Sequence, residues 1–312
     1  MFCILAFMVL GLLGIFSASS RTLAKEALDC VLRRVTLRPC TTGFDERMKS
    51  RILGSVINRS ETAARALNKN FELLSWVFFL LIFGSSLFAI RGMYLFYVTG
   101  SCNGLNQSAF CVLDPKGQSN EVSAVSTTCN LKSPGLTNVT LKGVDLSGFP
   151  VLHPGAMHKI VMIGCYACDY SRKVYPEIRD LANRSGAEFT FADYPVKVKT
   201  DLTTRLGLCV HQQDQTKYWK LNDILFATDK ANLDSPAFVQ KAIADLGLDS
   251  SKINRCLDSS ATEDRVDKQL NEIANSNFYG TPTIFIDNTV FVGPKPYRVY
   301  AISMQGLLYW LH

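Results

Sequence analysis

Cys165 and Cys168, with two residues between them, are the side chains of this sequence best suited to chemistry. A thiolate is a nucleophile and a metal ligand, and two thiols at this spacing can close a reversible disulfide. Three interpretations follow: a redox pair, half of a metal site, or a static structural disulfide. The choice depends on the elements that carry the two cysteines and on the side of a membrane that they face.

A short apolar run, residues 159–164, precedes the pair and is typical of a buried strand. A helical pattern that ends at a glycine follows it, over residues 168–186. This order predicts Cys165 at the helix N-terminus, with Cys168 one turn further in. Unpaired N–H groups and the helix dipole favour an anion there, so we expect a lowered pKa for Cys165. Cys165 would then be the exposed attacking sulfur and Cys168 the buried resolving one.

Strand and helix patterns alternate through the rest of the C-terminal half. "EFTFADYPV" is rich in strand-forming residues, and a helical stretch follows over about residues 200–275. "TPTIFID" and "NTVFVG" then predict a hairpin around Asp287-Asn288, followed by a closing amphipathic helix. This order predicts an α/β sheet protein interrupted by a helical insertion.

Two uncharged apolar segments, residues 1–18 and 73–90, precede this region. Spanning the hydrocarbon takes about 17–25 residues, so we expect two transmembrane helices, the second extending to residue 99. Residues 19–72 hold eleven Lys/Arg against six Asp/Glu, which favours a cytoplasmic loop. The sequence therefore predicts a two-pass protein of the cell membrane, in contact with lipid, with its C-terminal domain extracytoplasmic.

Residues 100–157 are rich in Ser, Thr, Asn, Gly and Pro, which predicts an irregular extracytoplasmic tether with short strands. A disulfide is expected within the tether, and its pairing stays open among Cys102, Cys111, Cys129 and Cys3. Cys30 and Cys40, on the cytoplasmic side, are expected to be reduced. Residues 100–312 carry 21 basic and 21 acidic residues, so no basic patch indicates nucleic acid.

A second motif far along the chain, "YGTPTIF" at residues 279–285, adds a resemblance to the thioredoxin superfamily and its DsbA-like branch. In that family a cis-proline faces the C-x-x-C pair, and Thr281-Pro282 matches its position. A cis bond costs little for proline. The missing N–H would keep the adjacent edge open for an extended substrate strand. The resemblance covers about residues 158–312 and implies a thioredoxin-like sheet.

The helical insertion also resembles that of DsbA-like proteins. Cys209 and Cys256 match two cysteines that form a structural disulfide in part of the family. Tyr166-Ala167 departs from the Pro-His or Pro-Tyr that DsbA-type oxidases often carry between their cysteines. The first strand lacks the buried acid that thioredoxins place behind the pair, although Asp193 lies on the neighbouring strand.

The resemblance implies a membrane-anchored thiol–disulfide oxidoreductase. Its catalytic residues would be Cys165, Cys168, Thr281 and Pro282. Substrates would be cysteine-containing extracytoplasmic proteins, and a membrane partner of the DsbB or vitamin-K-epoxide-reductase kind would reoxidise the pair. No cofactor or metal is expected, and the direction of the reaction stays open between oxidation, reduction and isomerisation.

Two alternatives remain beside the static disulfide. Zinc could be held by four thiolates, from Cys165, Cys168, Cys209 and Cys256. The chain could also be a non-catalytic thioredoxin-fold module that binds or scaffolds partners at the membrane.

Overall fold

The computed structural model describes residues 18–35, 43–57, 60–107, 109–124, 139–196 and 200–311. The chain divides into two compact units, Met1–Arg91 and Gly92–His312.

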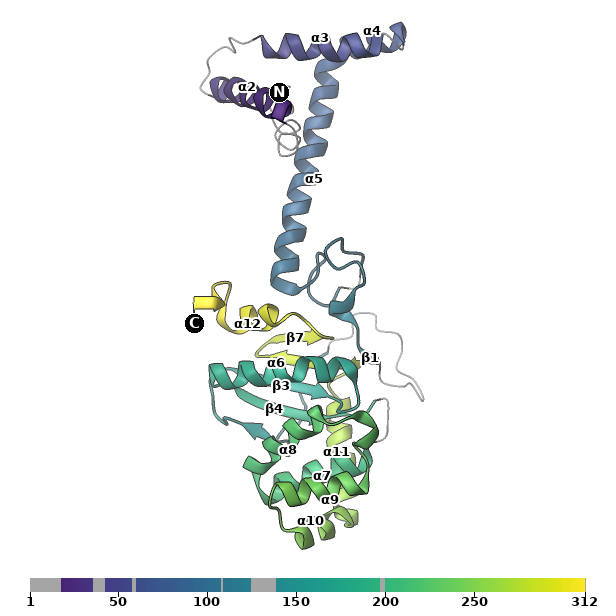
Figure 1. The fold of residues 1–312 in the computed structure, drawn as a ribbon, viewed down its shortest axis with the longest axis vertical. Helices are drawn as coiled ribbons and strands as arrows, with labels where there is room; N and C mark the ends of the chain where they lie inside the picture. The colour runs from purple at the N-terminus through teal and green to yellow at the C-terminus, as the bar shows by residue number, and fades with distance from the viewer. Residues whose placement is uncertain are drawn as a thin grey trace. The chain divides into compact units, whose positions relative to one another are not determined.

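Five strands form a mixed sheet through the middle of the second unit (Figure 1). Their order is β2 (Val151–Leu152), β4 (Glu188–Asp193), β3 (Lys159–Gly164), β6 (Thr283–Ile286) and β7 (Thr289–Val292). The central pair, β3 and β4, is parallel, and the other neighbouring pairs are antiparallel. This is the thioredoxin-like α/β arrangement that the sequence predicts, including the hairpin around Asp287-Asn288. Because β2 joins this sheet, the sheet begins before residue 158.

Alternate residues of β3 face two different cores, as the period of a strand requires. Ile160 and Met162 lie in a large core shared with α6 (Asp169–Ser185) and α12 (Tyr297–Gln305). Val161 and Ile163 lie in a smaller core on the other face of the sheet. Burial on both faces explains why the β3 sequence is apolar without interruption.

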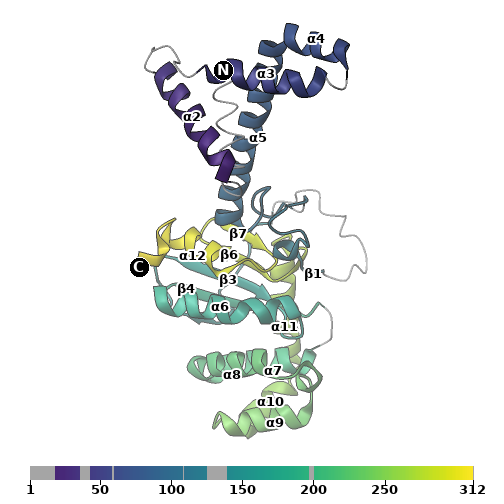
Figure 2. The same cartoon turned by 45° about the horizontal axis from the view of Figure 1, so that its top comes forward.

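Helices occupy the chain between β4 and β5 (Gly280–Thr281), and those over residues 201–257 lie on the far side of the unit from β7 (Figure 2). They are α7 (Asp201–Gln213), α8 (Gln215–Ala227), η2 (Lys230–Asn232), α9 (Pro236–Asp245), α10 (Ser250–Leu257) and α11 (Ser260–Ala274). A disulfide between Cys209 and Cys256, with an S–S length of 1.96 Å, joins α7 to α10. Since these sulfurs are bonded to each other, they cannot be the zinc thiolates of the four-cysteine alternative.

Part of the predicted tether, residues 102–124, packs on the domain. Cys102 and Cys111 form a disulfide with an S–S length of 2.02 Å, whereas Cys3 and Cys129 lie outside the described residues. The Asn106 side chain donates to the Val290 carbonyl at 2.8 Å and accepts from the Val292 N–H at 2.9 Å. These bonds pair the free edge of β7. Further along, β1 (Ser123–Ala124) pairs with β5.

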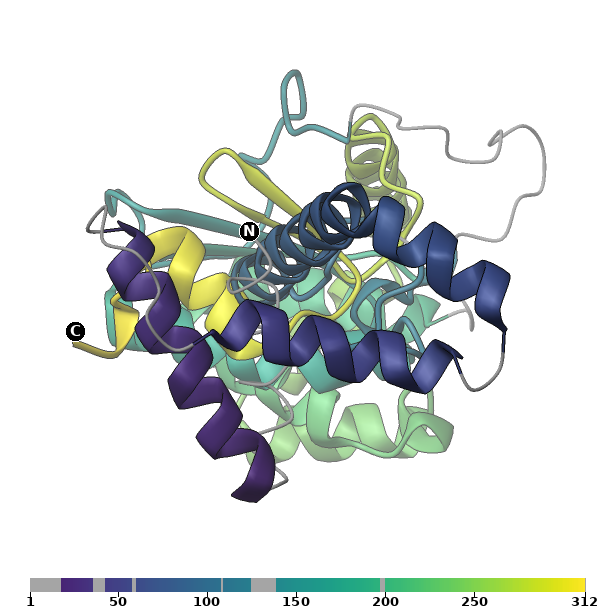
Figure 3. The same cartoon turned by 90° about the horizontal axis from the view of Figure 1, so that it is seen from above.

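The first unit contains α2 (Ala18–Val35), α3 (Phe44–Ile57), α4 (Glu61–Lys69) and the start of α5 (Phe71–Thr99). Figure 3 shows α3 and α4 as a helical hairpin. Within the described ranges α5 is the helix long and apolar enough to cross a membrane, with 29 residues and a mean hydropathy of 2.3. The other expected span, residues 1–18, lies outside the described residues except for Ala18.

Cys30, in α2, is buried and disulfide-bonded. The expectation of a reduced thiol at this position is therefore wrong. Disulfides persist in oxidising compartments. The bond does not fit the cytoplasmic placement expected for residues 19–72.

Candidate active site

The turn between β3 and α6 consists of Cys165, Tyr166, Ala167 and Cys168. The Cys168 N–H donates to the Cys165 carbonyl at 3.1 Å, and Cys168 is the N-cap of α6. The prediction that Cys165 lies at the helix N-terminus is therefore wrong. The reason is the length of the strand: Gly164 still pairs with β4, so the chain needs these residues to turn. The Cys165 N–H is instead satisfied by the Ser171 hydroxyl at 3.2 Å.

Both cysteines are fully buried, with 0% of each residue exposed, and the structure holds them as thiols. The expectation of an exposed Cys165 is wrong for this state. A hydrogen bond with the Cys168 thiol raises the pKa of Cys165, and burial and the charge of Asp193 raise it further. The expected lowering of this pKa is therefore wrong as well, because Cys165 lies before the N-cap of α6, and the Cys168 hydrogen bond and burial favour its thiol form.

Thr281 and Pro282 are joined by a cis peptide bond and are both buried. Thr283, the next residue, pairs with Ile163 near the end of β3. Because β3 and β6 are antiparallel, the residues before Thr283 continue toward Gly164 and the cysteine turn. The ladder therefore brings the two motifs, more than a hundred residues apart in sequence, to the same end of the sheet.

Asp193 lies behind the cysteines, directly opposite Gly164 in the parallel ladder. Its Oδ2 accepts a hydrogen bond from the Thr204 hydroxyl at 2.6 Å, while its buried Oδ1 has no partner among the described residues. Burial raises the pKa of Asp193 to about 7, the Thr204 bond opposes the rise, and the charge of Cys168 adds to it. The sequence could have indicated this position of Asp193, because the residue ends the strand next to β3. The carboxyl ends of parallel strands lie at the same edge of a sheet.

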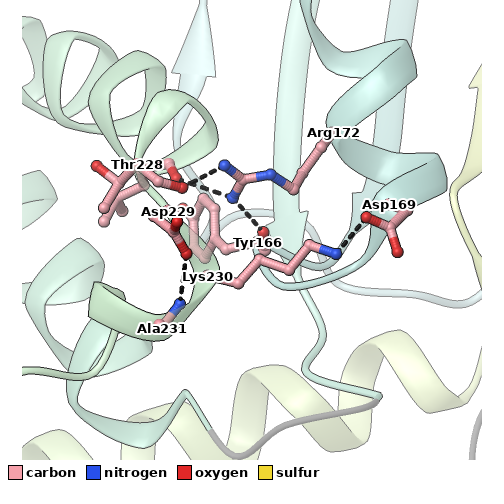
Figure 4. Close-up of polar contacts among 8 residues, drawn as sticks. Tyr166, Asp169, Arg172, Thr228, Asp229, Lys230 and Ala231 are labelled. Atoms are coloured by element: carbon pink, nitrogen blue, oxygen red, sulfur yellow. Dashed lines mark hydrogen bonds and ion pairs between the residues drawn. The ribbon is translucent and has the colours of Figure 1, made fainter.

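The insertion holds Tyr166, one of the two residues between the cysteines. Tyr166 is buried, and its hydroxyl donates to Asn222 Oδ1 of α8 at 2.6 Å. Arg172, in α6, donates to the Tyr166 carbonyl at 2.9 Å and to the Thr228 carbonyl at the end of α8 (Figure 4). Lys230 pairs with Asp169 beside this clamp. Sequence reasoning missed Arg172, because its partners are backbone carbonyls that only the folded insertion supplies.

The edge in front of the cis-proline is occupied by the chain itself. Ser123 pairs with Thr281 and Ala124 with Gly280, in an antiparallel ladder. The expectation that this edge is open is therefore wrong in this state of the protein.

Residues 137–305 match the DSBA-like thioredoxin domain family, beginning earlier than the expected residue 158. Among solved structures, the thiol–disulfide exchange protein α-DsbA2 from Wolbachia pipientis is similar at 19% identity, over 48% of this chain and 82% of that chain, with a TM-score of 0.44. Oxidised BdbD from Bacillus subtilis is similar at 20% identity, over 50% and 89%, also with a TM-score of 0.44. The catalytic domain of Proteus mirabilis ScsC is similar at 18% identity, over 49% and 84%, with a TM-score of 0.43.

No curated protein matches this chain. The family match spans more than half of the 312 residues and contains the cysteine turn, the insertion and the Thr281–Pro282 peptide. This chain belongs to the DSBA-like thioredoxin domain family.

Proposed function

We propose that this chain is a membrane-anchored thiol–disulfide oxidoreductase that forms, reduces or isomerises disulfides in cysteine-containing extracytoplasmic proteins. The proposal depends on one observation: Cys165 and Cys168 lie at the same end of the sheet as the cis Thr281–Pro282 peptide. The two thiols interact with each other, so they lie close enough to form a reversible disulfide.

The reaction runs through Cys165. In the oxidising direction, a substrate thiolate attacks the Cys165 sulfur of the closed pair, the Cys165–Cys168 bond breaks, and Cys168 leaves as a thiolate. A second substrate thiolate then attacks the substrate sulfur of the mixed disulfide and displaces Cys165. The substrate loses two electrons and the pair gains them. Reduction of a substrate disulfide is the same sequence in reverse.

Asp193 is the group that we assign to the proton of Cys168. When Cys168 leaves as a thiolate in a buried site, the nearby protonated carboxyl can supply a proton to it. Its Oδ1 is free to do so, since no described residue holds that atom. Its pKa of about 7 suits proton exchange near neutral pH.

Two features support the proposed location, α5 and the disulfides of the second unit. A helix of 29 residues with a mean hydropathy of 2.3 is long and apolar enough to anchor the domain in the cell membrane. Cys102–Cys111 and Cys209–Cys256 fit an oxidising compartment, which supports an extracytoplasmic position of the domain. We assign reoxidation of the reduced pair to a membrane redox partner of the DsbB or vitamin-K-epoxide-reductase kind.

The test uses the full chain in detergent micelles, with oxidation of a dithiol peptide and reduction of insulin as the two assays. Cys165→Ser should abolish both activities. Cys168→Ser should accumulate a mixed disulfide with insulin, because Cys165 attacks an insulin disulfide, one insulin sulfur leaves as a thiolate, and no second thiol of the pair resolves the new bond. The matched control is the double variant Cys102→Ser/Cys111→Ser, which removes a disulfide outside the site and should stay active. Activity that survives Cys165→Ser would rule out the mechanism. A wild-type chain inactive in both assays would favour the non-catalytic binding module.

A further inference from the structure

We propose that residues 119–124, the covering segment, are an internal mimic of the substrate that lies along the cis-proline edge and keeps the active-site cysteines covered until a substrate strand displaces it. This inference rests on the proposed function and concerns the regulation of the same site.

The geometry of the covering segment is that of a captured peptide. Its β1 residues run antiparallel to β5, with Ser123 opposite Thr281 and Ala124 opposite Gly280. Addition of an extended strand to a free sheet edge is a common mode of peptide capture. The ladder lies directly before Pro282, which has no N–H to extend it. A substrate strand that uses this edge must therefore take the place of β1.

Gly280 is what allows the covering segment to approach so closely. A Cβ built on Gly280 would lie 2.6 Å from Val122 Cγ2 and 2.9 Å from the Ser123 carbonyl oxygen. Neither distance leaves room for a side chain on residue 280. Val122 and Ser123 occupy the space that such a side chain would need. Ser123 is 2% exposed as a result.

Contacts outside the edge hold the covering segment in position. Glu121 Oε2 accepts a hydrogen bond at 2.5 Å from the hydroxyl of Tyr170, the second residue of α6. At the other end, the Lys295 ammonium donates to the Ser119 carbonyl. The segment is thus attached both to the helix that follows Cys168 and to the loop before α12.

The attachment at the edge itself is weak. Ser123 and Thr281 face each other in the ladder, yet both hydroxyl oxygens are buried without a partner in the part of the chain that the structure describes. Permanent strands normally satisfy such groups, and leaving them unpaired costs stability. A ladder of two residue pairs with two unsatisfied hydroxyls is suited to exchange. In this state Cys165 is 0% exposed, so a protein thiol cannot reach its sulfur until some of its surroundings move.

The test measures how fast iodoacetamide modifies Cys165 in the reduced full chain in micelles, with the Cys165 peptide quantified by mass spectrometry. Ser123→Pro removes an N–H from the edge, and Glu121→Ala removes the bond to Tyr170 without touching the edge. Both should speed the modification, Ser123→Pro by about tenfold or more if the uncovered state is a minor population. Lys116→Ala, an exposed position just before the covering segment, is the matched control and should leave the rate unchanged.

A synthetic peptide SNEVSA, the sequence of residues 119–124, added to the Ser123→Pro variant should slow the modification again. Wild-type rates in both Ser123→Pro and Glu121→Ala would overturn the inference, and Glu121→Ala keeps it testable if the proline variant does not fold. The two proposals fail differently. Faster modification without any disulfide exchange would overturn the oxidoreductase alone. Exchange that requires Cys165 but modification rates that ignore the covering segment would overturn only the inference.

Discussion

At the scale of single residues, the site holds a buried carboxyl group, that of Asp193, beside two buried thiols. Asp193 has one oxygen bound by Thr204 and one without a partner among the described residues. Water does not solvate the charge, so the carboxyl keeps its proton to higher pH than an exposed aspartate. Two consequences can be measured, one on stability and one on rate.

Asp193→Asn should stabilise the fold increasingly as pH rises. The pKa of Asp193 is about 7 in the folded chain, whereas an unfolded aspartate has a pKa of about 3.9. Between these values the folded state binds the extra proton, so the stability of the wild type falls as pH rises through the window. Asparagine does not ionise, so the free energy of unfolding of Asp193→Asn should exceed that of the wild type by about 4 kcal/mol at pH 8. Urea unfolding at pH 4 and pH 8 measures this, and an equal difference at both would contradict it.

The same variant should alter the pH dependence of thiol–disulfide exchange. If Asp193 supplies the proton to Cys168, the rate of the wild type should change near pH 7, and Asp193→Asn should lose that inflection and react about tenfold to a hundredfold more slowly at its optimum. A matched control is Asp245→Asn, an exposed carboxylate at the end of α9. Stopped-flow exchange with a dithiol peptide from pH 5 to 9 makes the comparison. An unchanged inflection in Asp193→Asn would assign it to another group.

At the scale of elements, the insertion matters because it holds the cysteine turn. Arg172→Ala should destabilise the fold by about 1–3 kcal/mol, because the Tyr166 and Thr228 carbonyls lose their donor. Arg172→Lys should recover only part of the loss, since an ammonium cannot replace the planar fork that bridges two acceptors. Lys230→Ala removes the exposed ion pair with Asp169 and should cost no more than about 1 kcal/mol. Equal losses in the alanine variants, measured by urea unfolding, would argue against the clamp.

The two disulfides of the second unit should differ in their effect on stability. Cys209–Cys256 closes a separation of 47 residues and Cys102–Cys111 one of 9. Loop-closure entropy predicts a loss of about 4 kcal/mol for Cys209→Ser/Cys256→Ser and about 2.5 kcal/mol for Cys102→Ser/Cys111→Ser. Denaturant unfolding of both double variants against the wild type gives the comparison. A larger loss from the shorter loop would show that packing, and not chain entropy, dominates.

The elements that the sequence predicts are those with a local signal. The β3 residues form a continuous apolar run, α6 ends at Gly186 with φ of 65°, and the turn after β6 falls on Asp287-Asn288. The shortest strands have no such signal. In β1 and β2 two residues are too few to show a period, and each pairs with residues far away in the sequence. Pairing of that kind is fixed by the assembled sheet.

The site also contains residues that the sequence reveals and features that only the fold determines. Cys165 and Cys168 are evident from their spacing, and Thr281-Pro282 from the motif around it. The burial of the cysteines and the approach of Asp193 depend on the register of β3 against β4 and on packing by the insertion. The position of Cys165 relative to the helix was wrong by one turn because the end of a strand is set by its partner strand, and that partner is not visible locally.

At the scale of the whole molecule, the compartments of the two ends of the chain depend on whether α5 spans a membrane. Its 29 residues reach about 44 Å as a helix, which exceeds the roughly 30 Å of a hydrocarbon core. If α5 spans the membrane, the residues before Phe71 and those after Thr99 must lie on opposite sides. The disulfides of the second unit favour the oxidising side for it, and the basic residues before α5 favour the cytoplasm for them. The disulfide at Cys30 opposes that second placement.

Two lysine-to-cysteine variants test whether α5 spans the membrane. Lys69 and Lys116 are both exposed, one directly before α5 and one after it. A membrane-impermeant maleimide applied to intact cells should label Lys116→Cys, and it should label Lys69→Cys only after permeabilisation, because charged reagents do not cross the bilayer. The wild-type chain gives the background from its own cysteines. Labelling of both variants in intact cells would show that α5 does not span the membrane, and would make the Cys30 disulfide the better guide to where the first unit lies.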